Sequence, residues 1–493
     1  MKFKIDPERV ISTRDRMIYG QFLEHHHRQI YGGVFDPASK FADEDGFRTD
    51  VLEALREIQT PIIRWPGGCF VSAYDWKKGV GKRVPAYDKA WLVEDPNTFG
   101  TDEFISLCRK LNCEPYICTN AGTGTPEEMS DWMEYCNLKN EGLYARQRIE
   151  NGHTEPYGVK YWSIGNENYG SWEMGAKESA EWSRFVTESA KMMIRVSPEA
   201  ELSAAALGDP EWNFNLFKKA GNLLDWISIH SYWDWMPLSD YGACMAYTTD
   251  LDSQIVKVKG MMAALGYSNI RIAYDEWNLR AWYHPNIDVR KRPYTYENIV
   301  APRFVNDINA QYTMADAVFT ACFLNMLHRH ADTVRMATFS PAVNTRGMIF
   351  THENGIVKRS MWHVYRLYTQ RMFEQVIDLY ANDSEKAAFT DKNGKEVLVD
   401  AIDCVATRSP ESGRLGISIV NKKPNETATV SFSLPKIADQ AELFTVNGES
   451  ADDYNDIDRE NIRIRENNSG VKIEGNVITV TIEPHSVNVL NVR

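Results

Sequence analysis

Short hydrophobic runs alternate with helix-like segments from residue 17 to about residue 370. The segments 126–137, 178–197 and 310–331 carry apolar residues at three- and four-residue spacing or open with helix-start residues, and they predict helices. Eight strand–helix units predict an α/β protein with a (β/α)8 TIM barrel. The alternative is an open doubly wound sheet, but the sequence lacks the glycine-rich nucleotide loop that usually accompanies one. The predicted strands are 17–25, 61–65, 114–120, 160–166, 200–206, 226–232, 270–277 and 336–342.

The pattern changes after about residue 375. Residues 414–421, 427–434 and 476–484 alternate apolar and polar positions, which predicts an additional antiparallel β-sandwich domain of jelly-roll-like form. The first 15 residues do not follow the barrel pattern, and we expect them to donate a strand to this sandwich. The predicted domains are therefore a barrel over residues 16–372 and a sandwich built from 1–15 plus 373–493. The stretch 380–386 is the nearest thing to a linker.

Composition and charge narrow the function classes. Of 493 residues, 43% are hydrophobic and 25% are charged, which is typical of a globular protein. A formal charge of −13 with no basic stripe argues against nucleic acid as a partner. We see neither a signal peptide nor an 18-residue apolar run, so we expect no membrane contact and a cytoplasmic location. The eight cysteines form no CxxC pair and are expected to be reduced core residues.

Two of the predicted barrel strands end on acidic residues. Asn166 and Glu167 follow the fourth strand, and Asp275 and Glu276 end the seventh. In a (β/α)8 barrel the chemistry lies at the carboxyl ends of the strands, so Glu167 and Glu276 would face one cleft. Two carboxylates across a cleft can break a glycosidic bond, one as acid and one as nucleophile or base. Any single strand end of this kind is equally compatible with the start of a helix or loop, and it is the pair that favours a glycosidase.

The sequence resembles glycoside hydrolase family 51, the α-L-arabinofuranosidases, within the clan A of (β/α)8 glycosidases. The resemblance covers essentially the whole chain. The set of matching stretches is far more specific than the motif Gly-Asn-Glu at 165–167 alone. Those stretches are YGQFLEHHHRQIYGGVFDP (19–37), DEDGFRTDVLEAL (43–55), RWPGGCFVSAYDWKKGVG (64–81), FGTDEF (99–104), KYWSIGNEN (160–168) and YDEWN (274–278).

The resemblance implies a retaining, exo-acting α-L-arabinofuranosidase that removes terminal arabinofuranosyl residues from oligosaccharides. Glu167 matches the general acid/base and Glu276 the nucleophile, with carboxyl groups roughly 5 to 5.5 Å apart. Family members work through a covalent glycosyl-enzyme, need no cofactor and are often homo-oligomers, many of them hexamers. The implied substrate contacts are Glu24, Cys69, Asn166 and Tyr232, with Arg64 beside the nucleophile, where its charge would keep Glu276 ionised.

Further residues are candidates for the cleft on position alone. His230 precedes Tyr232 by two residues and faces either the cleft or the core. Trp91, Trp233, Trp235 and Trp282 fall in loops on the expected active face, and we expect one or two of them, with Trp91 and Trp282 as the candidates, to stack on sugar. His25, His26 and His27 lack a metal-site spacing, so we expect no catalytic metal and one histidine of the run lining the cleft. The departures from the family pattern are 25–28, Pro341, and the loops 232–243 and 279–285.

Two other functions remain open from the residues. One is a related retaining glycosidase for another furanoside or a pyranoside, such as a β-xyloside, β-glucan or galactofuranoside. The other is a carbohydrate-binding protein that kept the barrel without turnover; the presence of both glutamates argues against it.

Overall fold

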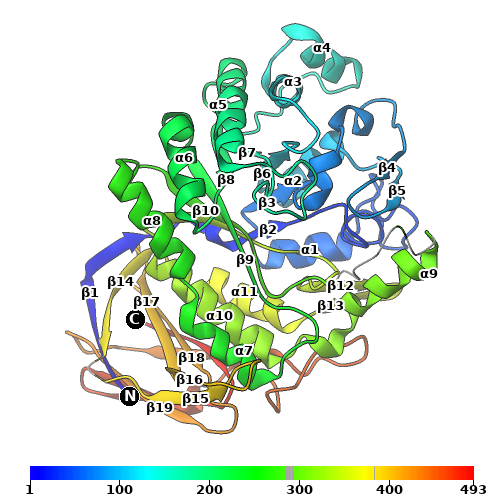
Figure 1. Cartoon of the computed structure of the whole chain (residues 1–493). Coiled ribbons are helices and arrows are strands. Elements are labelled where there is room, and N and C mark those ends of the chain that lie inside the picture. The colour runs from blue at the N-terminus through cyan, green and yellow to red at the C-terminus, as the bar shows by residue number, and fades with distance from the viewer. Residues whose placement is uncertain (284–289, 291–293, 382) are drawn as a thin grey trace.

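A closed barrel of eight parallel strands forms the larger part of the molecule (Figure 1). The computed structural model describes residues 1–283, 290, 294–381 and 383–493. The strands follow one another around the barrel in chain order, which confirms the predicted (β/α)8 architecture. They are β2 (Gly20–Phe22), β3 (Ile62–Trp65), β6 (Glu114–Thr119), β7 (Tyr161–Ile164), β8 (Glu201–Ala205), β9 (Trp226–Asp234), β10 (Arg271–Arg280) and β11 (Val334–Phe339).

Helices surround the barrel and bury one face against it. Helix α3 begins with Pro126 directly after Thr125, whose side chain accepts a hydrogen bond from the Glu128 amide and so caps the helix. The predicted helices 126–137, 178–197 and 310–331 correspond to α3, α5 and α10. The helices are α1 (Thr49–Glu57), α2 (Thr101–Leu111), α3 (Pro126–Asn137), α4 (Gly142–Glu150), α5 (Ser179–Val196), α6 (Pro210–Ala220), α7 (Tyr241–Ala246), α8 (Ser253–Leu265), α9 (Tyr296–Ile299), α10 (Met314–Arg329) and α11 (Ser360–Arg371). Among the described residues, no helix has the length and apolar character needed to cross a bilayer.

The second domain is one curled ten-stranded sheet, and both chain ends lie in it (Figure 1). Strands from both ends of the sheet contribute to a shared hydrophobic core, which gives it a sandwich-like form. All pairings are antiparallel except that of β1 with β19. In spatial order the strands are β21 (Arg463–Glu466), β20 (Ala441–Asn447), β24 (Val487–Val492), β18 (Leu415–Asn421), β17 (Ile402–Arg408), β14 (Gln375–Ala381), β1 (Lys2–Thr13), β19 (Ala428–Ser433), β23 (Val477–Ile482) and β22 (Val471–Glu474).

The stretch 380–386 does not connect the two domains. Tyr380 and Ala381 already belong to β14 and pair with β1, and Lys386 opens β15 (Lys386–Thr390), which pairs with β16 (Glu396–Asp400). The predicted linker is therefore wrong, because residues at both of its ends belong to paired strands outside the barrel; Asn382 lies outside the described residues. Two further hairpins, β4 (Ala86–Asp88) with β5 (Val93–Asp95) and β12 (Ile349–His352) with β13 (Gly355–Lys358), complete the strands.

Candidate active site

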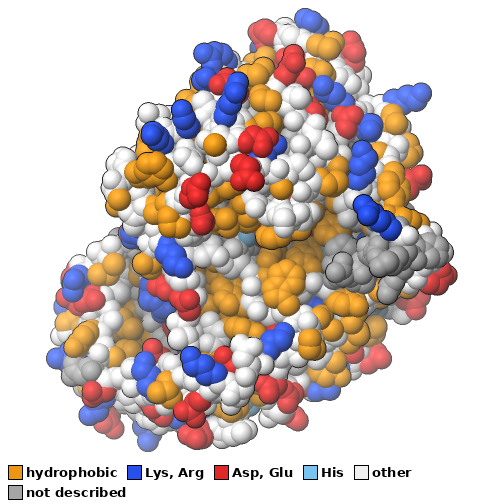
Figure 2. Space-filling model, in the orientation of Figure 1, with side chains coloured by type: hydrophobic (Ala, Val, Ile, Leu, Met, Phe, Trp, Pro, Cys, Tyr) orange, Lys and Arg blue, Asp and Glu red, His pale blue; other side chains and the backbone are white. Residues whose placement is uncertain are grey.

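A cavity of about 510 Å³ opens at the carboxyl ends of the barrel strands. Figure 2 shows hydrophobic side chains gathered in a hollow near the centre of the displayed face. Both glutamates from the strand ends, Glu167 and Glu276, line the cavity. The lining residues are Glu24, Gly68, Cys69, Lys89, Ala90, Trp91, Glu167, Trp172, Met174, Tyr232, Trp235, Glu276 and Trp282.

Two donors hold the Glu276 carboxylate in place. Arg64 Nη1 donates to Glu276 Oε1 at 2.6 Å, and the Tyr232 hydroxyl donates to Oε2 at 2.8 Å. The Tyr232 oxygen also lies 2.7 Å from Ser340 Oγ, which can donate to it in turn. Because one donor is a guanidinium, the pair of bonds is strong as well as directional. These two contacts fix the orientation of the Glu276 carboxyl group at the cavity.

Arg64 connects β10, which carries Glu276, to the end of the fourth strand, β7. It is fully buried, its Nη2 donates to Asn166 Oδ1 at 2.9 Å, and its Nε lies 3.3 Å from Asp275 Oδ2. Burial alone would lower the pKa of Arg64, but the neighbouring charges, those of Asp275 and Glu276 among them, hold it well above the usual value. Strand β10 shifts its register against β9 between Ala273 and Glu276. Such a bulge re-aims side chains, and here one arginine contacts two consecutive carboxylates.

Glu167 is held by a different pair of donors. His230 Nδ1 lies 2.9 Å from Glu167 Oε1, and Trp172 Nε1 donates to Oε2 at 2.9 Å. The Glu167 backbone has φ of 45°, a left-handed conformation that costs free energy in a residue with a side chain. Burial raises the pKa of Glu167, but the hydrogen bond and charge of His230 outweigh it and lower that pKa.

His230 carries the proton of this pair. Its Nε2 lies 3.2 Å from Asp275 Oδ1 and its Nδ1 lies 3.7 Å from Glu276 Oε2, so carboxylates face both ring nitrogens. Burial lowers the pKa of His230, but Glu276, Asp275 and Glu167 together raise it to about 10. The imidazolium therefore donates to Glu167, and the two side chains share one proton.

The two glutamates lie close together. One oxygen from each carboxylate and a nitrogen of His230 all fall within 4.8 Å of one another. Among the described residues this is the one cluster with metal-ligand geometry. A protonated His230 offers no lone pair to a metal, so the cluster is better suited to proton transfer.

Asn166 and Glu24 are both buried, and of the two only Glu24 lines the cavity. Asn166 Nδ2 donates to Glu173 Oε1 at 2.9 Å, and burial raises the pKa of that carboxyl to about 7. Glu24 Oε1 accepts from the Phe70 amide at 3.0 Å and from Trp91 Nε1 at 2.9 Å. Gly68, with φ of 59°, lies so close that a β-carbon there would fall 2.3 Å from the Glu24 carboxyl. Glycine at this position is what allows the turn to approach Glu24.

The predicted residues divide between the cavity wall and the layer behind it. Glu24, Cys69, Trp91, Glu167, Tyr232, Glu276 and Trp282 line the cavity, whereas Arg64, Asn166 and His230 stand behind the two catalytic candidates and are not among the lining residues.

The expectation that one histidine of 25–27 lines the cleft is wrong. His25 Nδ1 lies 2.6 Å from Asp95 Oδ2, and His27 Nε2 lies 3.4 Å from Asp307 Oδ2. His26 stacks on Trp91 with ring centroids 3.9 Å apart and lies behind the cavity wall. The run follows β2 as a loop, so each ring is free to find its own partner. Trp233 also turns away from the cavity and packs on Phe319 and Phe323.

Sequence reasoning missed several cavity residues. Trp172, Met174 and Lys89 line the cavity, and Trp172 donates to the candidate acid. A signal for Trp172 was present, because it lies five residues after Glu167 on the same strand-end loop. No comparable pattern identifies Lys89. Of the loop 279–285, His284 and Pro285 lie outside the described residues.

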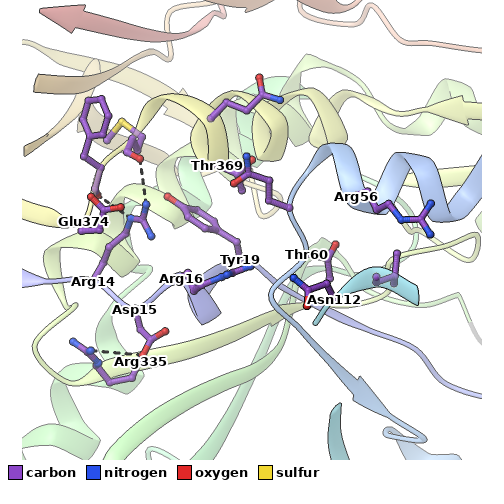
Figure 3. A pocket seen from close by; sticks show the side chains of 15 residues that line it. Arg14, Asp15, Arg16, Tyr19, Arg56, Thr60, Asn112, Arg335, Thr369 and Glu374 are labelled. Carbon is purple, nitrogen blue, oxygen red and sulfur yellow. Dashed lines mark hydrogen bonds and ion pairs between the residues drawn. The ribbon is translucent and has the colours of Figure 1, made fainter. Parts of the chain in front are cut away.

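A larger cavity of about 750 Å³ lies at the opposite, amino-terminal end of the barrel strands (Figure 3). Arg14 donates there to the Phe373 and Met372 carbonyls, and Arg335 pairs with Asp15 at 3.6 Å. Glu374 and Asp15 are its two acidic lining residues, and no pair of carboxylates is hydrogen-bonded to a shared histidine there. Size alone would select this cavity, but both candidate catalytic glutamates line the smaller one.

Two family models match the chain. The model described as "Alpha-L-arabinofuranosidase 1 domain" matches residues 54–237, and "Alpha-L-arabinofuranosidase C-terminal domain" matches residues 275–486. Among curated proteins, the chain is 34% identical to "Intracellular exo-alpha-(1->5)-L-arabinofuranosidase" of Acetivibrio thermocellus over 72% of each chain. It is 31% identical to "Intracellular exo-alpha-(1->5)-L-arabinofuranosidase 1" of Bacillus subtilis, over 99% of this chain and 98% of that protein.

Solved structures give the same picture. The arabinose complex of the α-L-arabinofuranosidase from Thermotoga maritima superposes with a TM-score of 0.87 at 31% identity, covering 99% of both chains. A GH51 α-L-arabinofuranosidase from Thermotoga petrophila superposes with the same TM-score at 31% identity, covering all of both chains.

Proposed function

The chain belongs to the α-L-arabinofuranosidases of glycoside hydrolase family 51, and from this premise we propose how it breaks the bond: Glu167 acts as acid/base and Glu276 as nucleophile in a retaining double displacement. The enzyme is an exo-acting glycoside hydrolase that removes terminal arabinofuranosyl residues. The observation that carries the proposal is that carboxylate oxygens of Glu167 and Glu276 lie within 4.8 Å in one cavity.

In the first step Glu276 attacks the anomeric carbon while the leaving oxygen takes a proton from Glu167. That proton comes from the pair formed with His230, whose Nδ1 lies 2.9 Å from Glu167. The resulting glycosyl-enzyme ester removes the negative charge of Glu276. In the second step Glu167 accepts a proton from water, and the water oxygen displaces Glu276 and releases arabinose. The side chains of the site supply both proton transfer and nucleophile, so the mechanism uses no cofactor.

The remaining site residues are proposed either to orient these two glutamates or to contact the sugar. Arg64 and Tyr232 orient Glu276, and Asn166 is held by Arg64 and Glu173 with amide hydrogen left for a sugar hydroxyl. Glu24, Cys69, Trp91 and Trp282 are proposed to contact the furanose, since all four line the cavity.

We also propose a cytoplasmic location, domains at 16–372 and at 1–15 plus 373–493, and a homo-oligomer, possibly a hexamer by family resemblance. The curated relatives named "intracellular" support the location. Imported arabinofuranosyl oligosaccharides would then be the substrates, with no part for nucleic acid or membrane.

Glu276→Gln is the test of the mechanism. Loss of the nucleophile should reduce kcat on nitrophenyl α-L-arabinofuranoside by at least about 10³-fold while arabinose still binds in calorimetry. Glu167→Ala should slow hydrolysis by about 10²–10⁴-fold for poor leaving groups but far less for dinitrophenyl substrates, which need no protonation. If the wild type hydrolyses a xyloside, glucoside or galactofuranoside but not the arabinofuranoside, the substrate assignment is wrong. If the wild type binds the sugar without hydrolysing it, the mechanism is wrong.

A further inference from the structure

The catalytic cavity contains one cation among its described lining residues. Three of those residues are acidic, Glu24, Glu167 and Glu276, and each already accepts hydrogen bonds from protein donors. The cation is Lys89. Since the chain carries a formal charge of −13, a negatively charged substrate is disfavoured at long range, and a cation at the cavity changes which substrates can bind.

The backbone around Lys89 is fixed. Lys89 lies in the turn that joins β4 to β5, where the Asp88 carboxylate accepts from the amides of Ala90 at 2.8 Å and Trp91 at 3.2 Å. Trp91 is buried and donates to Glu24. The turn is therefore closed internally by Asp88 and anchored to the cavity wall through Trp91.

The Lys89 side chain, in contrast, is exposed and has no hydrogen-bond or ion-pair partner within the described ranges. Most exposed lysines are simply hydrated. This one differs because it lines the catalytic cavity on an anchored turn, and because the Asp88 carboxylate next to it is directed to backbone amides instead. Its ammonium is available to a bound molecule.

Arabinose itself has no charged group to pair with an ammonium. The deeper lining residues, Glu24 and Trp91, offer a carboxylate and a ring edge suited to neutral hydroxyls, whereas exposed Trp172 and Trp235 lie toward solvent with Lys89. An ion-pair partner for Lys89 would thus belong to the part of the substrate that leaves.

We propose that Lys89 binds a carboxylate on the leaving-group side, so that the preferred substrates are arabinofuranosyl oligosaccharides whose chain carries a uronic acid. This inference rests on the proposed function and narrows its substrate class. An exposed ion pair of this kind corresponds to a gain in kcat/KM of about two- to fivefold, which added salt should reduce.

The test compares two arabinofuranosylated oligosaccharides that differ in one backbone residue, a neutral sugar in one and the corresponding uronic acid in the other. The measured quantity is the ratio of kcat/KM for the acidic substrate to that for the neutral substrate. For the wild type this ratio should exceed one and fall as sodium chloride rises from 20 to about 500 mM. Lys89→Met should lower the ratio by about two- to fivefold and remove its salt dependence, and Lys89→Arg should restore most of it.

Lys82→Met is the matched control, because Lys82 is an exposed lysine of the same segment that does not line the cavity. It should leave the ratio unchanged. The role of Lys89 would be overturned if the wild type and Lys89→Met gave the same kcat/KM ratio. It would also be overturned if Lys82→Met lowered the ratio as much as Lys89→Met does. Failure of the wild type to hydrolyse either substrate would instead overturn the proposed function, so the two failures are distinguishable.

Discussion

His230 is the residue on which the protonation state of the cavity depends. It lies between Glu167, Asp275 and Glu276, and their charges raise its pKa to about 10. The proton needed by the leaving group is therefore present on the pair of His230 and Glu167 across the neutral range, although the pKa of Glu167 itself is lowered. In the proposed mechanism, formation of the glycosyl-enzyme neutralises Glu276, one of the charges that raise the pKa of His230, and so favours release of the proton from His230.

Replacing His230 should therefore move the pH profile. In His230→Asn the asparagine amide can still donate a hydrogen bond to Glu167. It cannot carry an acidic proton, so the proton for the leaving group must then reside on Glu167 itself. The alkaline limb of kcat/KM should shift to lower pH, and kcat/KM at the optimum should fall roughly 10- to 100-fold, the value of one charged hydrogen bond. His230→Phe, which removes the donor as well, should lose more.

The same substitution has a signature in stability. Since the folded-state pKa of His230 lies above its ordinary 6.5, its contribution is complete below about pH 6.5 and is lost as pH rises through about 10. Urea denaturation of wild type and His230→Asn should thus converge over this range. An unshifted alkaline limb together with parallel stability curves would show that His230 is neutral and merely structural.

At this scale the sequence predicted the positions of the two strand-end glutamates, and the family resemblance placed Arg64 beside Glu276, but neither predicted the bond from Trp172 to Glu167. Glu167 and Glu276 follow from where hydrophobic runs stop. The bond from Trp172 to Glu167 depends on how a loop folds back, and the separate partners of His25, His26 and His27 depend on a loop that carries no period.

The elements of the barrel were more predictable than its residues, because burial imposes a period. Helix α10 is buried along almost its whole length, since it packs between the barrel and strands β17 and β18. Phe323 on this helix stacks on Trp277, the residue after Glu276, with ring centroids 3.8 Å apart. The linker prediction for 380–386 fails because polar composition alone does not distinguish a segment between two strands of one domain from a connection between domains.

Phe323→Ala should lower the free energy of unfolding by about 3–5 kcal/mol, the usual cost of removing a buried phenylalanine. Chemical denaturation gives this value directly. The matched control is Phe214→Ala on α6, where the ring is 45% exposed and the change should stay within about 0.5 kcal/mol. Similar decreases in the free energy of unfolding in both variants would mean that packing of Phe323 behind Glu276 makes no special contribution to stability.

At the scale of the whole molecule, the two domains share helices. Asn325 of α10 donates to Asp403 at 3.0 Å, and the Tyr368 hydroxyl of α11 lies 2.6 Å from Ser418 Oγ. Helix α11 also contacts β20 and β24 of the sheet. Substitutions that destabilise the sheet should consequently destabilise the barrel as well.

The double substitution of Phe3 and Ile5 by alanine tests this coupling, because both side chains are buried in the sheet core far from the cavity. It should lower the midpoint of thermal unfolding, and activity, circular dichroism and tryptophan emission should be lost together. Alanine at Val10 and Ile11, which are 40% and 51% exposed on the same strand, should change little. If the circular dichroism signal and the activity are lost at different temperatures, the two domains are not coupled in this way.

Strand β1 lies between β14 and β19, which are translated more than 350 residues after it. At about 5–20 residues per second, roughly 20 to 80 s pass on the ribosome before the nascent strand meets both neighbours. During this interval its unpaired edge is open to other chains, and a chaperone that holds the emerging amino-terminal segment would protect it.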